Sequence, residues 1–424
     1  MPPATRRLAA GPRKRAVSAR GGSLQGAEVP CGLVPRHLTP VPAPADPLAL
    51  LPQVRAALDG TAPLAVLPAG PPATVEAARA VLRPEQPLED GADLVVVTSG
   101  STGGGRGVLL SAGAVRASAE ATLRRLGGPG AWLLALPVSA IAGLQVLCRS
   151  ILGDTAPTVL GPGEPLAAAV ARMPAGRRCT ALVPTQLRRY LDAEPAALRA
   201  FHAVLVGGAA TDPGLLAQAR DEGVAVVTTY GMTETAGGCV YDGEPLDGVR
   251  VRLTDGGDAA GPGGTGIELA GPVLATGYRL DPEGTAAAFA DGWFRTRDAG
   301  TLDDAGRLTV HGRLDDVVVT GGVNVAPQAV EGVLRQHPDV LDAVVLGRPD
   351  DEWGQRVVAA VVPAPGATPD LAALRVWVAE RLGGPAAPRE LHRIDAVPTL
   401  HTGKPDRRGL AARLPGAAVL DGRR

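Results

Sequence analysis

The sequence predicts an α/β protein: a large N-terminal domain of helix-covered β-sheets with a small β-barrel-like subdomain, followed by a small α+β domain. First, 424 residues are more than one hydrophobic core usually holds. Second, short apolar runs alternate with segments rich in Ala, Leu and Arg from about residue 46 to 300, which is typical of parallel sheets covered by helices. Third, residues 245–312 change to short strands between Gly, Asp and Pro turns, which favours an antiparallel or barrel-like unit.

Residues 1–30 are expected to form a disordered basic tail. They carry six basic residues up to Arg20 and no acidic residue before Glu28. They also lack the apolar core of a secretory signal. A transit peptide and an anion-binding arm are alternative interpretations of the same charge.

The N-terminal domain is expected to cover residues 31–312. A helix is predicted near residues 112–125, and strands at residues 94–97, 132–136, 181–183, 204–206 and 224–228. The barrel-like part is expected to hold strands at residues 249–253, 265–270 and 308–311.

The C-terminal domain is expected to cover residues 313–424, with a hinge at Asp315. Helices are predicted near residues 327–337 and 370–382, and strands near residues 340–346 and 357–362. A loop that carries Lys404 follows them. About a hundred residues of this kind are enough for an independent domain.

The composition is that of a soluble globular protein, with 45% hydrophobic residues and a formal net charge of -1. The longest apolar stretch, residues 131–148, is interrupted by Pro137, Ser139, Gly143 and Gln145, so no membrane span is expected. The four cysteines are widely spaced, which predicts reduced thiols, no zinc site and a cytoplasmic protein. We expect no nucleic-acid partner, and a homodimer remains open.

A loop rich in glycine and hydroxyl groups follows the predicted strand at residues 94–97. It consists of Thr98, Ser99, Gly100, Ser101, Thr102 and Gly103, with residues 104–107 after them. Glycines let a backbone approach a ligand closely, and hydroxyls with consecutive amides surround phosphate oxygens. The pattern therefore predicts a phosphate loop, and a flexible turn is the alternative. It is not a Walker loop, because the Gly-Lys-Ser/Thr ending is missing.

A second motif, residues 228–235, follows the predicted strand at residues 224–227. It includes Thr229, Tyr230 and Glu234. A carboxylate at the end of a strand is placed where open α/β sheets bind ligands, and one carboxylate is enough for Mg²⁺ when phosphates supply the other oxygens. Glu234 is therefore the predicted metal ligand, and a capped loop is the alternative.

Lys404 is one of only two lysines among the 42 basic residues. Arginine has replaced lysine almost everywhere, so a site that needs a compact ammonium on a flexible stem explains its retention. A solvated surface lysine is the alternative.

These motifs, in this order, resemble the adenylate-forming superfamily of acyl-CoA synthetases, luciferases and peptide-synthetase adenylation domains. The resemblance extends from the phosphate loop to the end of the chain. It also includes residues 207–209, 293–298, 312–316 and 403–404.

The resemblance implies a role for each matching residue. The loop from Thr98 to Gly107 would hold the β- and γ-phosphates of ATP, with Thr102 at the reacting groups. The adenine would lie beside Gly207, Gly208, Ala209, Thr229 and Tyr230. Glu234 would bind Mg²⁺, and Asp298 would bind the ribose hydroxyls. Arg313 would assist at the ribose or phosphates, Asp315 would be the swivel of a mobile lid, and Lys404 would bridge the substrate carboxylate and the α-phosphate.

Some positions depart from the family pattern. Gly105-Arg106 replaces the Pro-Lys of many relatives, and Arg297 replaces the usual glycine before the ribose aspartate. Residues 137–143 lack the aromatic or His side chains common there, which would enlarge the acyl pocket.

Three segments, residues 136–147, 182–188 and 230–241, resemble o-succinylbenzoate-CoA ligases of menaquinone synthesis in actinobacteria. The resemblance implies an aromatic carboxylic acid as substrate, ATP and Mg²⁺ as cofactors, and coenzyme A as co-substrate. An acyl-adenylate and pyrophosphate would form first, and a CoA thioester second. The acyl pocket would include Ala142, Gly143, Gly231, Met232 and Thr235.

Several alternatives stay open. Arg188 would meet a second substrate carboxylate or be a surface arginine, and Trp353 would stack on the CoA adenine or pack in the core of the small domain. The enzyme could instead load an aryl acid onto a carrier protein, or act on another aromatic acid. A nucleotide-binding scaffold without catalysis is the third hypothesis.

Overall fold

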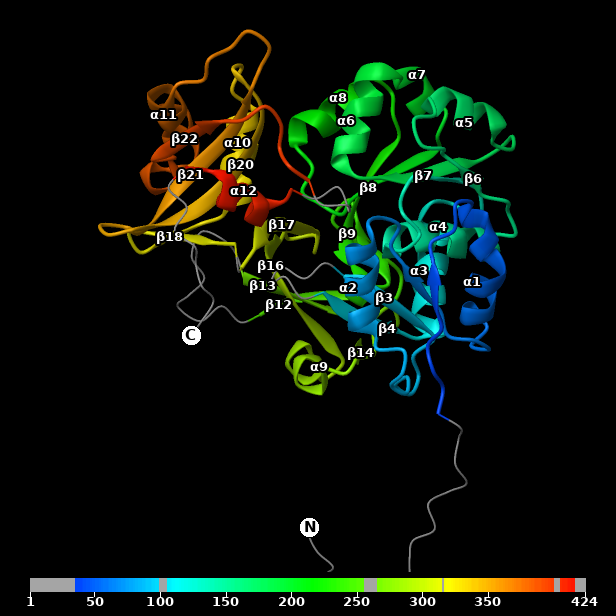
Figure 1. The fold of residues 1–424 in the computed structure, drawn as a ribbon. Helices are drawn as coiled ribbons and strands as arrows, with labels where there is room; N and C mark the ends of the chain where they lie inside the picture. Colours follow the sequence, from blue (N-terminus) through cyan, green and yellow to red (C-terminus); the bar gives the residue numbers. More distant parts are fainter. Residues whose placement is uncertain (1–34, 99–104, 255–264, 315, 400–404, 416–424) are drawn as a thin grey trace, which may run out of the picture. The chain divides into compact units, whose positions relative to one another are not determined.

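The computed structural model describes residues 35–98, 105–254, 265–314, 316–399 and 405–415 (Figure 1). The predicted basic tail, the central part of the phosphate loop, Asp315 and Lys404 lie outside these residues. In the part of the chain that is described, no helix is long and apolar enough to cross a bilayer.

The largest sheet has seven strands in the order β11-β10-β9-β8-β7-β5-β6. Its strands are β5 (Ala131–Leu134), β6 (Thr158–Val159), β7 (Arg178–Leu182), β8 (Ala203–Val206), β9 (Val226–Met232), β10 (Gly237–Tyr241) and β11 (Glu244–Pro245). Five strands of this sheet, β5 to β9, pair in parallel, as predicted. The chain reverses direction after Met232, so β10 pairs with β9 in antiparallel orientation, and β11 pairs with β10 in the same way at the edge of the sheet.

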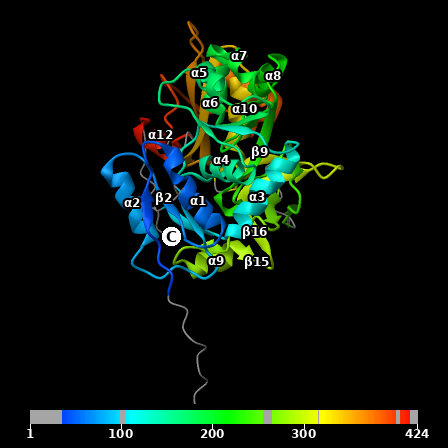
Figure 2. The ribbon, with the colours of Figure 1, turned by 90° about the vertical axis from the view of Figure 1, so that its right-hand side faces the viewer.

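Helices cover both faces of this sheet (Figures 1 and 2). Strand β5 shows the alternation: Ala131 and Leu133 face one core, and Trp132 and Leu134 face the other. The first core lies under α5 (Leu166–Arg172), α6 (Pro184–Ala193), α7 (Pro195–Leu198) and α8 (Pro213–Asp221). The second lies under α1 (Leu51–Leu58), α3 (Ala112–Arg125) and α4 (Ile141–Leu152), which pack on one another.

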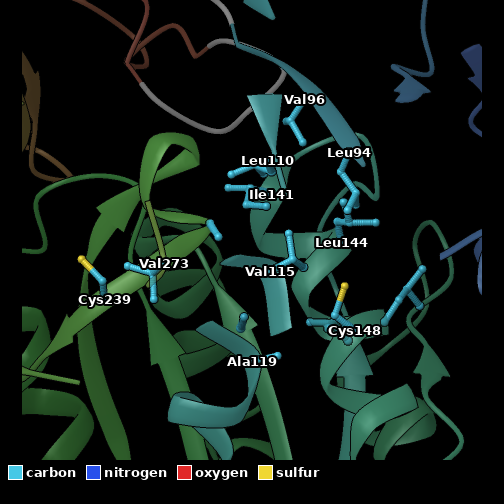
Figure 3. Packing of buried hydrophobic residues seen from close by; sticks show 14 of the residues in the cluster. Leu94, Val96, Leu110, Val115, Ala119, Ile141, Leu144, Cys148, Cys239 and Val273 are labelled. Atoms are coloured by element: carbon cyan, nitrogen blue, oxygen red, sulfur yellow. The ribbon is translucent and has the colours of Figure 1, made fainter. Parts of the chain in front are cut away.

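The second core joins distant parts of the sequence (Figure 3). Leu94 and Leu110 meet Val115 of α3 and Leu144 of α4 in one buried cluster, and Val273 belongs to the same cluster. The strands around the phosphate loop are therefore fixed to the helices behind the main sheet.

A small antiparallel sheet carries the two ends of the phosphate loop. It has the order β14-β4-β3, with β3 at Leu94–Thr98, β4 at Arg106–Leu110 and β14 at Gly277–Tyr278. No strand was predicted between the loop and the helix near residues 112–125, and β4 corrects this. β4 was missed because its five residues, which start with Arg106 and Gly107, show no clear alternation of apolar and polar side chains. Its pairing with Tyr278 is a long-range contact. Nearby are β1 (Pro40–Pro42), η1 (Pro47–Leu50), β2 (Ala65–Leu67) and α2 (Pro72–Leu82).

The expected change after residue 245, from parallel strands to short antiparallel strands, is confirmed. β12 (Arg250–Leu253), β13 (Thr265–Ala270), β16 (Trp293–Leu302), β15 (Phe289–Ala290) and β17 (Leu308–Arg313) form a five-stranded antiparallel sheet, with α9 (Pro282–Ala288) beside it. Arg313 is the last residue of β17, so the predicted boundary at residue 313 cuts one residue from this strand.

The C-terminal part has its own sheet and its own cores. The sheet has the order β19-β18-β21-β20, with β22 parallel to β21. Its elements are β18 (Val318–Thr320), β19 (Val323–Val325), α10 (Pro327–Arg335), β20 (Val340–Asp350), β21 (Gly354–Pro363), α11 (Leu371–Leu382), η3 (Gly384–Ala386), β22 (Glu390–Arg393) and α12 (Arg407–Arg413). Along β20, Ala343 and Val345 face α10 and α11, whereas Val344 and Leu346 face α12.

Candidate active site

Glu234 lies in a tight turn between β9 and β10. The strand continues to Met232 and the 3-10 turn η2 covers Thr233–Thr235, so most of the predicted motif lies inside the strand instead of after it. Gly231 has a φ of 153°, and an added Cβ there would overlap the carbonyl oxygen of Gly237 on β10. Glycine is therefore required where the two strands approach each other before the turn.

The side chain of Thr235 closes this turn from inside. Its Oγ1 accepts a hydrogen bond from the Met232 amide at 2.9 Å and donates one to the Gly237 carbonyl at 2.7 Å. Thr235 is fully buried. Its hydroxyl therefore bonds to the backbone of the turn on both sides.

Two buried side chains from the helices behind the sheet hold the residue after the turn. The carbonyl of Ala236 accepts hydrogen bonds from Ser118 Oγ at 3.0 Å and from Gln145 Nε2 at 2.7 Å. Ala236 has a left-handed φ of 51°, which is unfavourable for alanine. The hydrogen bonds stabilise this backbone and so fix the turn that carries Glu234.

The carboxylate of Glu234 has one partner in the described residues. Tyr278 donates a hydrogen bond from its hydroxyl to Glu234 Oε1 at 3.1 Å. Burial, and then the negative charge of Glu234, raise the pKa of Tyr278, so the hydroxyl stays protonated. Among the described residues the second oxygen of Glu234, Oε2, has no hydrogen-bond partner and is available to a ligand.

The donor set suits a magnesium ion bound mainly by phosphates. No group of three or more His, Cys, Asp or Glu side chains in the described ranges could hold a metal alone. Mg²⁺ retains several waters and takes one or two carboxylates together with substrate phosphates. A single half-buried Glu234 matches that requirement.

Tyr230, Asp298 and Arg313 come together from three strands. The Tyr230 hydroxyl donates to Asp298 Oδ2 at 2.8 Å, and Arg313 Nε lies 3.7 Å from Asp298 Oδ1. Asp298 and Arg313 are partners in the register of β16 and β17. Burial, and then the charge of Asp298, raise the pKa of Tyr230, so its hydroxyl remains a donor. The structure thus brings together three residues that the sequence analysis assigned to one nucleotide.

The glycine pair after β8 lies against β9. An added Cβ on Gly207 would overlap Oγ1 of Thr229, and Gly208 has a φ of 80°. The side chain of Thr229 donates to the Val206 carbonyl at 3.3 Å. Gly207 and Thr229, two of the residues predicted at the adenine, are therefore in contact.

Only the ends of the phosphate loop are described. Thr98 and Arg106 face each other in the register of β3 and β4, and Thr98 Oγ1 donates to the Arg106 carbonyl at 3.4 Å. Ser99, Gly100, Ser101, Thr102 and Gly103 lie outside the described residues, as do Lys404 and Asp315. Their roles stay predictions from the sequence.

Two predicted acyl-pocket residues lie at the start of α4. Ala142 is exposed and Gly143 is buried. An added Cβ on Gly143 would overlap the carbonyl oxygen of Pro137. Gly143 therefore allows α4 to pack on the loop after β5. Met232 is half-buried, at the end of β9.

The contacts of Arg188 and Trp353 bear on the alternatives left open. Arg188 Nη2 lies 3.8 Å from Asp212 Oδ2, and its side chain is 38% exposed, as expected of a surface arginine. The Trp353 ring packs under Arg389, whose guanidinium carbon lies 3.9 Å from the ring centroid, and an added Cβ on Gly321 would come within 2.7 Å of it. These contacts favour a packing role for Trp353.

A model of the AMP-binding enzyme family matches residues 44–279. That match covers more than half of the chain. The chain belongs to the AMP-binding enzyme family. The AMP-binding enzyme C-terminal domain also matches, over residues 329–404.

Two relatives of this AMP-binding enzyme carry related names. A protein of Mycobacterium tuberculosis, named a probable 2-succinylbenzoate–CoA ligase, is 45% identical over 388 residues, which cover 89% of this chain and 98% of the relative. A 2-succinylbenzoate–CoA ligase of Geobacillus kaustophilus is 34% identical, with 81% of this chain and 74% of the relative covered.

A solved structure shares the fold of this AMP-binding enzyme. It is the o-succinylbenzoate CoA synthetase (MenE) of Bacillus subtilis in complex with the acyl-adenylate intermediate OSB-AMP. Its TM-score is 0.69 at 26% identity, with 85% of this chain and 80% of that chain covered. The predicted fold class is confirmed as that of adenylate-forming enzymes.

Sequence reasoning missed Ser118, Gln145 and Tyr278 in this AMP-binding enzyme. Gln145 interrupts an apolar stretch that forms α4, and a polar residue at a core position signals a buried hydrogen bond. Tyr278 had no such signal. Its hydrogen bond to Glu234 joins residues 44 positions apart.

Proposed function

We propose that this protein is an AMP-forming 2-succinylbenzoate–CoA ligase. The observation that carries the proposal is the 45% identity to the Mycobacterium tuberculosis relative across 98% of that relative's length. The clustering of Tyr230, Asp298 and Arg313 supports it, because the residues assigned to the nucleotide are neighbours.

The proposed reaction has two steps at one site. In the first, a carboxylate oxygen of the substrate attacks the α-phosphorus of ATP, the bond to the β-phosphate breaks, and pyrophosphate leaves. In the second, the sulfur of CoA attacks the acyl carbonyl, AMP leaves, and the thiol proton passes to solvent. The substrates are therefore ATP, coenzyme A and an aromatic carboxylic acid.

The nucleotide would be held by residues on β9, β16 and β17 and by residues that follow β8 and β3. Gly207, Gly208, Ala209 and Thr229 would contact the adenine, and Tyr230 would hold Asp298 toward the ribose hydroxyls. Arg313 would neutralise the ribose aspartate or the phosphates. The loop from Thr98 to Gly103 would surround the β- and γ-phosphates with amides and hydroxyls.

Two anions must meet in the first step. Their repulsion is on the order of 4 kcal/mol at about 4 Å with an effective dielectric constant near 20. Lys404 would offset it by lying between the carboxylate and the α-phosphate, as a preorganised positive charge. Mg²⁺ bound to Glu234 would supply further positive charge to the phosphate oxygens.

The second step needs Lys404 to withdraw. We propose domains at residues 31–312 and 313–424, with Asp315 as the swivel between them. Rotation of the smaller domain would remove the ammonium group and admit the thiol. Support comes from the separate cores of the two parts, which share no member among the described residues.

The acyl group would lie near Ala142, Gly143, Gly231, Met232 and the Thr235 turn. Their small side chains would leave room for an aromatic ring. A cytoplasmic location and a homodimeric assembly complete the proposal.

A pyrophosphate exchange assay tests the substrate. With 2-succinylbenzoate, ATP and Mg²⁺ we expect exchange of labelled pyrophosphate into ATP, and CoA should then yield the thioester. Benzoate, indoleacetate and ferulate serve as comparison acids. Exchange with another acid only would contradict the proposed substrate. Exchange without CoA turnover would indicate a carrier-loading enzyme, and no acyl-adenylate with any acid would indicate a scaffold.

Lys404→Ala tests the switch between the steps. Adenylation should fall by roughly two to three orders of magnitude, the scale of removing one transition-state charge stabiliser, while thioester formation from supplied acyl-adenylate survives. Lys14→Ala, at the only other lysine of the chain, is the matched control and should change neither step. Equal loss of both steps would rule out the switch.

A further inference from the structure

The segment 275–278 connects the turn that carries Glu234 with the hairpin that carries the phosphate loop. The Ala275 amide donates to the Glu234 carbonyl at 2.8 Å, and the Thr276 amide donates to the Leu109 carbonyl of β4 at 2.9 Å. Two neighbouring residues are thus hydrogen-bonded to the turn that would bind the cation and to the hairpin that would bind the phosphates.

Tyr278 extends this connection with its side chain. It lies on β14, and its hydroxyl donates to Glu234 Oε1 at 3.1 Å. Tyr278 is 6% exposed, and its ring packs on Phe289, with 5.7 Å between the ring centroids. Its amide donates to Thr285 Oγ1 at 2.9 Å. The backbone of Tyr278 is fixed by Thr285 and its ring by Phe289, so the hydroxyl is held in place as a donor to the Glu234 carboxylate.

Arg106 lies over the same ring. Its guanidinium carbon is 4.9 Å from the Tyr278 ring centroid, within the range of a cation–π contact. Arg106 begins β4, directly after the phosphate loop. A planar guanidinium stacks on an aromatic ring better than an ammonium group does. This contact gives a reason for arginine at position 106, where many relatives have lysine.

We propose that Tyr278 is a positioning residue for the metal-binding carboxylate: its hydroxyl fixes Oε1 of Glu234 so that Oε2 meets the cation of a bound metal–nucleotide complex. Arg106 supports the ring from the phosphate-loop side. The inference rests on the proposed function, because it presupposes a divalent cation bound with ATP.

The test measures metal binding directly with Mn²⁺, which binds oxygen ligands as Mg²⁺ does and has an electron spin resonance signal. The nucleotide is α,β-methylene-ATP, whose bridge between the α- and β-phosphorus atoms cannot be cleaved, so it cannot transfer AMP to the acid. Tyr278→Phe should weaken Mn²⁺ binding to the full-length protein with nucleotide by about tenfold, the scale for losing the partner of a metal ligand. Binding of the nucleotide without metal should not change.

Tyr241→Phe is the matched control. It also removes one buried hydroxyl, which bonds to Thr122 Oγ1 at 2.9 Å and lies behind the sheet. This variant should lose some thermal stability and bind Mn²⁺ as the wild type does. The unfolding midpoint of each variant, measured without ligands, checks that it folds.

A double-mutant cycle with Glu234→Gln separates positioning from a general loss of stability. In the Glu234→Gln background, Tyr278→Phe should cause no further loss of Mn²⁺ affinity. Equal losses in both backgrounds, or wild-type affinity in Tyr278→Phe, would overturn the inference. A wild-type protein that binds nucleotide but no Mn²⁺ would instead contradict the proposed function.

Discussion

The hydroxyl of Tyr230 donates a 2.8 Å hydrogen bond to Oδ2 of Asp298. The two residues are 68 positions apart and belong to different sheets, β9 and β16. The contact fixes one oxygen of the aspartate and leaves Oδ1 facing Arg313 at 3.7 Å. An aspartate held in this way needs little reorganisation to accept hydrogen bonds from a ribose.

Tyr230→Phe should therefore weaken ATP binding while the aromatic ring remains. A hydrogen bond to a charged group contributes about 1.5–3 kcal/mol, so we expect KM for ATP to rise roughly tenfold or more, with a smaller effect on kcat. Steady-state kinetics and calorimetry with a nonreactive ATP analogue measure this. Tyr190→Phe is the control, because among the described residues the Tyr190 hydroxyl has Arg189 as its one hydrogen-bond partner, in a helix on the other face of the main sheet. Equal KM values in Tyr230→Phe and wild type would show that the contact does not serve the nucleotide.

Gly143→Ala should destabilise the protein. Its methyl group would overlap the Pro137 carbonyl, and overpacking of this kind costs about 1–3 kcal/mol. Gly332→Ala in α10 is the matched control, because nothing lies within 4 Å of the added methyl group. It should be neutral or stabilising, by up to about 1 kcal/mol. Thermal unfolding compares the two. If Gly143→Ala keeps full stability and raises only KM for the acid, Gly143 faces the acyl pocket instead of the loop.

The described thiols should be unreactive in the folded protein. Burial raises the pKa of Cys148 and Cys239 to about 12 and that of Cys179 to about 11. Because the thiolate is the reactive form, raising the pH from 7 to 9 should produce little labelling at these three positions. Site-resolved mass spectrometry after reaction with iodoacetamide measures this, with denatured protein as the positive control. Rapid labelling of native Cys148 would mean that α4 opens locally.

The sequence predicts the regular parts of the fold well. The helix expected near residues 112–125 is observed at Ala112–Arg125, where Ser111 caps it by accepting a hydrogen bond from the Ala114 amide. β4 was missed because its partner, Tyr278, lies far away in the chain. β9 was predicted too short, since Gly231 allows an extended strand where the motif suggested a loop.

In the candidate site, too, local motifs were predicted and long-range contacts were missed. The resemblance supplied Tyr230, Glu234 and Asp298 as separate residues, because each lies in a recognisable motif. The contacts that orient them, Tyr230 with Asp298 and Tyr278 with Glu234, join distant positions. No local pattern of side chains encodes such pairs, so they required the structure.

The central claim is that a carboxylate oxygen of the substrate attacks the α-phosphorus of ATP. Oxygen-18 in the carboxylates of 2-succinylbenzoate tests it most directly, with ATP, Mg²⁺ and CoA present. The account predicts AMP that carries one oxygen-18 atom, together with unlabelled pyrophosphate and the CoA thioester. Unlabelled AMP, or the formation of ADP and phosphate in its place, would contradict it.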